Sequence, residues 1–188
     1  MAKQIPQRPE LHPNLAGETY AIVHSSYHAK YVDAMLLAAQ EELLAIDPEA
    51  KIITIPAPGA YEIPVICKAL ALDLSCAAII ALGVILKGET AHAHLIAQSV
   101  TNSLQSLALE TETPIIHEVL LLENERQAEE RCLGGGDTKL NRGVEAARAA
   151  IVCVNSLALI ETLSESGDYD EDDDEDDPDW LNEIFKKN

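Results

Sequence analysis

The sequence has few aromatic residues and no long apolar run. Phenylalanine, tryptophan and tyrosine make up 4% of the 188 residues, although apolar residues make up 47%. The core must therefore be aliphatic and rich in alanine, and the chain is long enough for one domain with a short extension. No apolar run reaches membrane-spanning length without interruption, and the first ten residues contain no apolar signal segment. We therefore expect a cytoplasmic protein with no membrane segment.

Cysteine pairs and metal-binding spacings are also missing. The four cysteines, Cys67, Cys76, Cys132 and Cys153, are widely spaced and lie mostly within apolar patterns. No C-x-x-C motif occurs, and the histidines add no zinc-type spacing. We expect buried, reduced thiols, with neither a disulfide framework nor a metal site.

Positive charge is scarce, since 13 lysines and arginines face 32 acidic residues and the net charge is -19. This balance argues against a nucleic-acid partner. Twelve of the acidic residues and only two lysines lie in residues 164–188, so we predict a largely disordered tail that repels itself. Trp180, Leu181, Ile184 and Phe185 can form one amphipathic turn that docks on the chain or on a partner. A solvated tail that keeps the protein soluble is the simpler interpretation.

Between the tail and a proline-rich arm over residues 1–17, strand-like and helix-like periods alternate in one domain over residues 18–163. The wholly apolar run at residues 77–86 is typical of a central strand in a parallel sheet that is covered on both faces. The alternation predicts a three-layer α/β/α sandwich of the flavodoxin-like class, with a four-stranded, mainly parallel sheet. The expected strands are residues 19–24, 52–55, 77–86 and 114–122, and the expected helices are residues 30–46, 61–72, 90–109, 124–132 and 141–163.

Ligands bind such sheets at the carboxyl ends of the strands, and G-E-T-A-H-A-H follows one predicted strand. Gly88 permits a tight turn, and Glu89 and Thr90 precede a helix whose free N–H groups and dipole favour an anion such as phosphate. His92 can point over the same pocket and move protons near neutral pH. His94 faces roughly the opposite way, so the two histidines do not present ligands to one metal. We expect His94 to be structural or exposed.

A second strand end carries the turn A-P-G-A-Y-E-I-P. Its prolines and glycine give the backbone a defined shape and leave amide and carbonyl groups free to bind a planar polar ligand. Tyr27, after the first strand, supplies a ring on which a heterocycle can stack, although a packing role is equally compatible with the sequence.

Three motifs occur in order within residues 17–163: P-G-A-Y-E-I-P, A-L-G-V-I-L-K-G-E-T-A-H and N-R-G-V-E-A-A. Together they resemble the 6,7-dimethyl-8-ribityllumazine synthase family of riboflavin biosynthesis. The resemblance implies that 5-amino-6-(D-ribitylamino)uracil condenses with 3,4-dihydroxy-2-butanone 4-phosphate, releasing phosphate and water, without cofactor or metal. The alternatives are a non-catalytic lumazine- or flavin-binding or structural paralogue, and a different phosphate-binding α/β enzyme that shares only the architecture.

The resemblance also implies residue roles, which we carry over by position. His92 would be the proton donor, and Tyr27 would stack on the uracil ring. Arg131, assisted by Lys139, would bind phosphate in the pocket of a neighbouring subunit. The remaining groups are backbone contacts: Ala60, Tyr61, Glu62, Val84, Ile85 and Leu86 for the uracil and ribityl chain, and Glu89 and Thr90 for the phosphate.

The sequence departs from the family pattern in the fourth strand. His117 stands where the family has a phenylalanine that covers the uracil from a neighbouring subunit. Leu121 and Leu122 replace hydroxyl-bearing residues, and Ser99 stands where glutamate is usual. Because His92, Arg131 and the P-G-A-Y-E turn remain, the resemblance favours a working enzyme. The loop over residues 131–143 is longer than in icosahedral members, which favours a homopentamer with shared sites, a decamer being the alternative. Riboflavin synthase is the expected partner protein.

Overall fold

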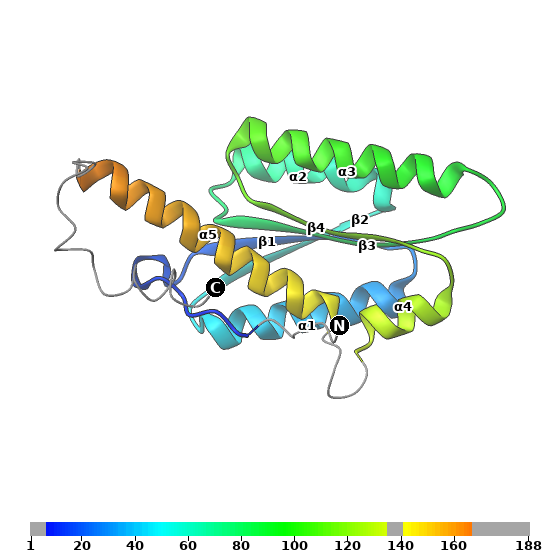
Figure 1. The fold of residues 1–188 in the computed structure, drawn as a ribbon, viewed down its shortest axis with the longest axis horizontal. Coiled ribbons are helices and arrows are strands. Elements are labelled where there is room, and N and C mark those ends of the chain that lie inside the picture. The colour runs from blue at the N-terminus through cyan, green and yellow to red at the C-terminus, as the bar shows by residue number, and fades with distance from the viewer. Residues whose placement is uncertain (1–6, 135–140, 167–188) are drawn as a thin grey trace, which may run out of the picture. The chain divides into compact units, whose positions relative to one another are not determined.

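The structure, a computed structural model, describes residues 7–134 and 141–166 (Figure 1). The chain divides into two compact units, Met1–Leu157 and Ala158–Asn188. The predicted disordered tail with its Trp180–Phe185 turn, and Lys139 in the loop before the last helix, lie outside the described residues. The predicted domain limits at residues 17 and 163 stay a prediction.

Four strands form one sheet in the order β2-β1-β3-β4, and every pairing is parallel. The sequence predicted a mainly parallel sheet of four strands, and this prediction is confirmed. Residues 78–85 of β3 are buried, as the wholly apolar run indicated, because helices cover both faces. The strands are β1 (Thr19–Ser25), β2 (Lys51–Ala57), β3 (Ala78–Leu86) and β4 (Ile115–Leu122).

The helices lie in two layers (Figure 1). On one face, α2 (Ile63–Asp73) and α3 (His92–Thr111) pack on the sheet in one aliphatic cluster. On the other face, α1 (Ala29–Ile46), α4 (Glu125–Cys132) and the first turns of α5 (Arg142–Ser166) pack in a second cluster. The two clusters complete the three-layer sandwich that the alternation predicted.

The observed element limits differ from the predicted limits by only a few residues. The helix α5 continues to Ser166 rather than ending at residue 163, and α3 begins at His92 rather than at residue 90. Short 3-10 turns appear at η1 (Pro13–Leu15) and η2 (Ala60–Glu62). Pro64 lies in the first turn of α2, where its missing N–H costs no hydrogen bond.

The close approach of α5 to α1 explains the glycine in the N-R-G-V-E-A-A motif. A Cβ atom on Gly143 would lie 1.9 Å from the carbonyl oxygen of Met35. Any larger residue would therefore force the two helices apart. Asn141, just before α5, donates to the Ala34 carbonyl oxygen at 3.2 Å and helps to hold the helix start in place.

Residues 142–164 of α5 are long enough and apolar enough to span a membrane. The core helix of a soluble protein can have the same length and composition. One side of α5 packs in the core with the sheet and α1, through Ala146, Ala147, Ala150, Ile151 and Val154. This packing accounts for the apolar residues on that side of the helix, whereas Val152, Leu157 and Ile160 of α5 are exposed.

The cysteines agree only in part with the expected buried thiols. All four are free, but only Cys67 and Cys132 are buried, whereas Cys76 and Cys153 are half-buried. Burial raises the pKa of the Cys67 thiol to about 12, so this thiol stays protonated at neutral pH.

Candidate active site

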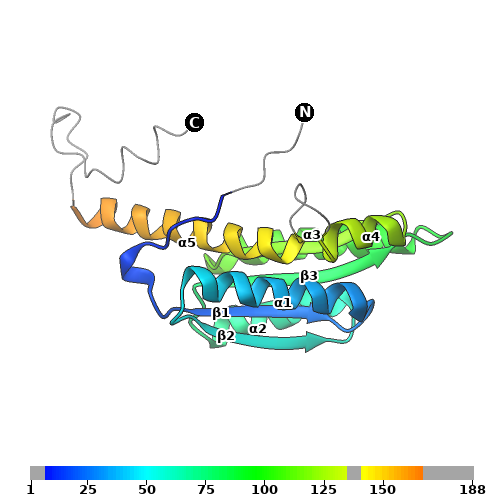
Figure 2. The same cartoon turned by 90° about the horizontal axis from the view of Figure 1, so that it is seen from below.

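The carboxyl ends of the four parallel strands lie at one edge of the sheet (Figures 1 and 2). Each segment that the sequence singled out follows one of these ends. The structure therefore brings four stretches that are far apart in sequence to the same edge: residues 25–28, 57–62, 87–92 and 121–124.

The Tyr27 side chain lies over the turn that follows β2. It is 69% exposed, and its Cδ2 atom lies 3.5 Å from the position that a Cβ atom on Gly59 would occupy. Glu62 Oε2 lies 3.0 Å from the same position, so a larger residue would displace one of them. The N–H and hydroxyl groups of Ser26 both donate to the Ala57 carbonyl oxygen, at 2.8 and 2.9 Å. Tyr27 and the P-G-A-Y-E turn thus form one continuous wall.

The turn after β2 exposes its backbone toward this edge. Gly59 is extended, and η2 follows it as a single 3-10 turn. The N–H groups that open such a turn have no partner within it. Ala60 is buried, whereas the Tyr61 side chain is 61% exposed. The turn therefore offers backbone donors next to the Tyr27 ring.

The central strand β3 extends beyond the strand beside it. The pairing of β1 with β3 ends at His24 and Leu82, whereas β3 continues beside β4 as far as Leu86. Within the described part of the chain, residues 84–86 pair with β4 on one side and have no strand on the other. The backbone groups on that open side can bond a ligand at the end of β1.

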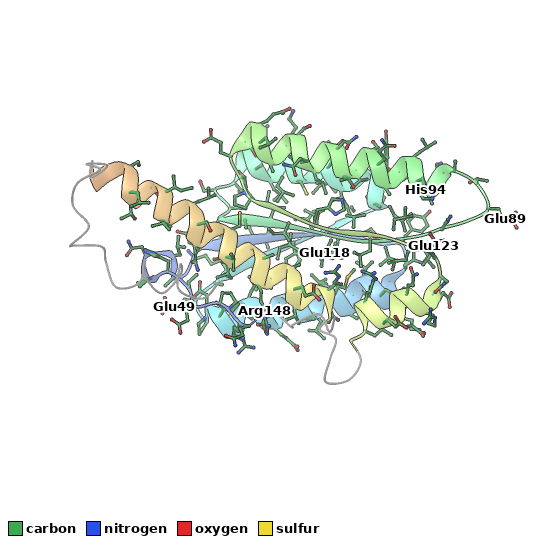
Figure 3. The ribbon with its side chains drawn as sticks, in the orientation of Figure 1. Glu49, Glu89, His94, Glu118, Glu123 and Arg148 are labelled. Carbon is green, nitrogen blue, oxygen red and sulfur yellow. The ribbon has the colours of Figure 1, made fainter. Side chains whose placement is uncertain are left out.

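Residues 87–91, where the sequence predicts an anion site, join β3 to α3. Gly88, Glu89 and Thr90 are exposed, and Figure 3 shows Glu89 at the outer bend of the loop. The Thr90 hydroxyl accepts a hydrogen bond from the His92 N–H at 3.4 Å. This bond uses one N–H group of the first turn of α3, because His92 is the first residue of that helix. The His92 side chain is also exposed.

An ion pair at the base of this loop was not predicted from the sequence. Lys87 Nζ lies 3.0 Å from Glu123 Oε2, between the end of β3 and the turn after β4. The turn is itself rigid, because the Asn124 side chain caps α4 through the Gln127 N–H, and Gln127 in turn accepts from the Glu123 N–H. Only the pairing of β3 with β4 brings this lysine and this glutamate together.

Arg131 lies in the last turn of α4, exposed to solvent. Among the arginines that the structure describes, it is the one without an ion pair to another described residue. The other four each pair with a glutamate: Arg8, Arg126, Arg142 and Arg148. The Arg131 guanidinium thus has no carboxylate partner among the described residues of its own subunit.

Comparison with known proteins adds to this geometry. The family model described as 6,7-dimethyl-8-ribityllumazine synthase matches residues 17–158. The chain is 35% identical over 159 residues to the 6,7-dimethyl-8-ribityllumazine synthase of Nitrosospira multiformis, covering 83% of this chain and 95% of that protein. It is 38% identical over 141 residues to 6,7-dimethyl-8-ribityllumazine synthase 1 of Caulobacter vibrioides, covering 74% and 90%. For the synthase of Mycobacterium avium the identity is 34% over 164 residues, covering 87% and 98%.

This chain belongs to the 6,7-dimethyl-8-ribityllumazine synthase family. It is accordingly an enzyme of riboflavin biosynthesis, a transferase, and the more remote alternative of an unrelated phosphate-binding enzyme is excluded. The match ends at residue 158, ahead of the acidic segment, so the tail is an addition to the part that resembles other lumazine synthases.

His117, the residue that departs from the lumazine synthase pattern, does not lie with Tyr27 and His92. It is near the amino end of β4, away from the carboxyl ends of the strands, and its ring contacts Thr101 on α3. Since β4 is an edge strand, His117 lies at the border of the sheet and is only half-buried. Burial lowers the pKa of the His117 ring below its usual range.

The other predictions and features lie outside this group. His94 is exposed on α3, as expected for a residue without a role at the site. Among the described residues, no cluster of histidine, cysteine and acidic side chains is arranged to hold a metal ion.

A cavity of about 390 Å³ opens at the amino ends of the strands, lined by Glu18, Thr113 and residues 71–77. It is at the opposite edge of the sheet from the lumazine synthase residues.

Proposed function

We infer that this chain catalyses the condensation of 5-amino-6-(D-ribitylamino)uracil with 3,4-dihydroxy-2-butanone 4-phosphate to 6,7-dimethyl-8-ribityllumazine. The observation that carries the inference is the gathering of three features at one sheet edge. These are the Tyr27 ring over the Gly59 turn, the open backbone of residues 84–86, and His92 behind the loop at residues 87–91.

The first two features suit the pyrimidine substrate. A planar uracil ring stacks on Tyr27, and its carbonyl and N–H groups bond to the backbone of residues 60–62 and of residues 84–86. The ribityl chain, with its row of hydroxyl groups, uses the same open backbone of β3.

The loop after β3 suits the phosphate of the second substrate. The amides of Glu89 and Thr90 face an anion ahead of α3, and the helix dipole adds to the attraction. Arg131 of a neighbouring subunit supplies a guanidinium, which bonds phosphate through two parallel N–H groups. Lys139, which lies outside the described residues, assists the same contact.

In the reaction, the primary amine of the pyrimidine attacks the ketone carbon and forms an imine with loss of one water. Elimination of inorganic phosphate then leaves an enol, which becomes a carbonyl group; the second nitrogen attacks this carbonyl carbon, and loss of a second water closes the ring. His92 donates the proton that the leaving phosphate oxygen needs, from the first turn of α3. Holding the two substrates together supplies much of the acceleration, so the histidine contribution is about a hundredfold.

We further propose that the active subunit assembly is a homopentamer with active sites between subunits. Exposed apolar residues on the α2 and α3 side support an interface there, since they lie on neighbouring helices of one layer. They are Val65, Leu72, Leu95 and Leu109, each between 63% and 72% exposed. The enzyme works in the cytoplasm on small-molecule substrates, and riboflavin synthase, which consumes the lumazine, is its partner protein.

The test is to mix the purified protein with both substrates and to follow lumazine fluorescence. We expect product well above the uncatalysed rate, together with light scattering on size exclusion that gives the mass of a pentamer. A folded pentamer that forms no product would contradict catalysis and support the non-catalytic paralogue. A decamer would keep the shared sites, whereas a monomer would contradict them.

A further inference from the structure

Both nitrogen atoms of the His117 ring are hydrogen-bonded within the subunit. Nδ1 accepts from the backbone N–H of Val119 at 3.2 Å. Nε2 lies 2.8 Å from the Thr101 hydroxyl oxygen. Because a ring nitrogen that accepts carries no proton, the neutral ring must hold its proton on Nε2.

The direction of the next hydrogen bond follows from the first. Nε2 donates to the Thr101 hydroxyl oxygen, and the Thr101 hydroxyl donates to the Ala97 carbonyl oxygen at 2.8 Å. The Ala97 carbonyl belongs to the helix α3, so the ring on β4 is fixed to a rigid element. Both ring nitrogens of His117 and the Thr101 hydroxyl group therefore have hydrogen-bond partners within the subunit.

This arrangement solves a problem that histidine creates at an aromatic position. A phenylalanine covers a ligand ring with an apolar face, whatever surrounds its edge. An imidazole also carries two polar atoms at its edge, and leaving either unpaired when the site closes costs free energy. Bonding both edge nitrogens within the subunit leaves the face of the ring for stacking, in a single orientation.

We propose that Thr101 is a positioning residue, which accepts from Nε2 and so fixes the plane of the His117 ring that covers the pyrimidine in a neighbouring subunit's site. The inference rests on the proposed condensation and on the uracil-covering position that the family resemblance gives to His117. Thr101 itself touches no substrate, because its hydroxyl is turned toward His117 and the helix backbone.

The test is a set of variants in the assembled enzyme. Thr101→Val keeps the shape of the side chain but cannot accept from Nε2, whereas Thr101→Ser keeps the hydroxyl. We expect Thr101→Val to raise KM for the pyrimidine by about threefold to tenfold with kcat within about twofold. Thr101→Ser should have the wild-type KM. In a His117→Phe background, Thr101→Val should have no effect, since phenylalanine needs no acceptor.

A structural measurement separates this inference from a general disturbance of α3. Nitrogen-15 NMR of the histidine rings should report a proton on Nε2 of His117 in all three proteins, because the Val119 N–H still donates to Nδ1. The Nε2–H should exchange faster with water in Thr101→Val than in the wild type and in Thr101→Ser, because it has lost its acceptor. If Thr101→Val raises KM equally in the wild-type and His117→Phe backgrounds, or in neither, the inference is overturned.

The variant His117→Ala distinguishes the two levels of failure. If His117→Ala raises KM for the pyrimidine but Thr101→Val does not, the role of Thr101 is wrong and that of His117 stands. If His117→Ala leaves KM unchanged in intact pentamers, His117 does not cover the substrate, and both proposals fall together.

Discussion

At the scale of single residues, the surroundings of two similar side chains separate a structural role from a functional one. Arg126 and Arg131 both lie on α4 and are both exposed. Arg126 pairs with Glu130 at 2.9 Å, one turn along the same helix. Arg131 pairs with no carboxylate in the described part of its own subunit. This difference agrees with the proposed role of Arg131 as a phosphate ligand, which the family resemblance implies.

Replacing Arg131 with alanine should weaken use of the butanone phosphate. We expect KM for this substrate to rise by about tenfold to a hundredfold, because a charged hydrogen-bond donor to phosphate is lost. KM for the pyrimidine should change little in steady-state assays. Arg126→Ala is the matched control and should leave both constants near the wild-type values. Equal effects of the two variants would show that general charge, and not a specific contact, is responsible.

His92 and His94 offer a second matched pair. Substitution of His92 by alanine should lower kcat by about tenfold to a hundredfold, since only proton donation is removed and the substrates stay bound side by side. His94→Ala should keep kcat within about twofold. Single-turnover measurements of lumazine formation check the chemical step directly. A His92→Ala enzyme with unchanged single-turnover rate would assign the proton transfer to another group or to water.

At the scale of the elements, a polar network fastens the N-terminal arm to two helices. Glu42 on α1 is only 6% exposed and accepts from Arg8 and from Arg148 on α5, at 2.8 to 2.9 Å. The side chain of Asn155, farther along α5, bonds the backbone of Glu10 and of His12 in the arm. One buried carboxylate thus joins three segments that are far apart in sequence.

This network makes a pH-dependent contribution to stability. The pKa of Glu42 is lowered, chiefly by its hydrogen bond with Arg8 and further by Arg148, against an opposing effect of burial. The folded state therefore favours the charged carboxylate. Its contribution is present above the unfolded pKa near 4.5 and is lost as the pH falls through the lower folded value.

We expect Glu42→Gln to lower the free energy of unfolding by about 2–4 kcal/mol at pH 7. The difference from the wild type should shrink as the pH is lowered below about 4.5. Urea unfolding at a series of pH values, at one protein concentration, measures both. Glu41→Gln, an exposed neighbour on α1, should change stability by less than about 0.5 kcal/mol at any pH. A Glu42→Gln difference that is constant with pH would contradict the assigned ionisation.

At the scale of the whole molecule, the residues proposed for the lumazine synthase site do not all lie together in one subunit. Tyr27, the Gly59 turn and His92 lie at the carboxyl edge, but His117 is held at the border of β4. Arg131 has no ion-pair partner among the described residues of its own subunit. In the proposed homopentamer, a second subunit brings these residues into one pocket.

Mixed assemblies of two impaired variants test this sharing. His92→Ala and Arg131→Ala subunits should each form weakly active pentamers. When they are unfolded together in equal amounts and refolded, about a quarter of the sites regain both residues if assembly is random. We expect activity well above the mean of the two parents. Parents refolded separately and then mixed are the control, and no gain in the co-refolded sample would contradict a site shared between subunits.

Much of this organisation could be predicted from the sequence because it depends on local periodicity. The wholly apolar run at residues 77–86 determined β3, and spacing alone separated His92 from His94 on α3. The turn chemistry of P-G-A-Y-E, with its proline and glycine, determined the wall beside Tyr27. These features depend on neighbours within a few residues, so their physical causes are visible in the sequence.

Only the tertiary structure decided the contacts between distant segments. The pairing of β1 with β3 ends at Leu82 and leaves residues 84–86 open; this depends on how two strands align, and no local pattern carries that register. The Lys87–Glu123 pair depends on the pairing of β3 with β4, and the Arg8–Glu42–Arg148 network and the Thr101–His117 bond depend on how helices pack against the N-terminal segment and the sheet. Side chains of ordinary type acquire these partners only because packing brings them within hydrogen-bond distance.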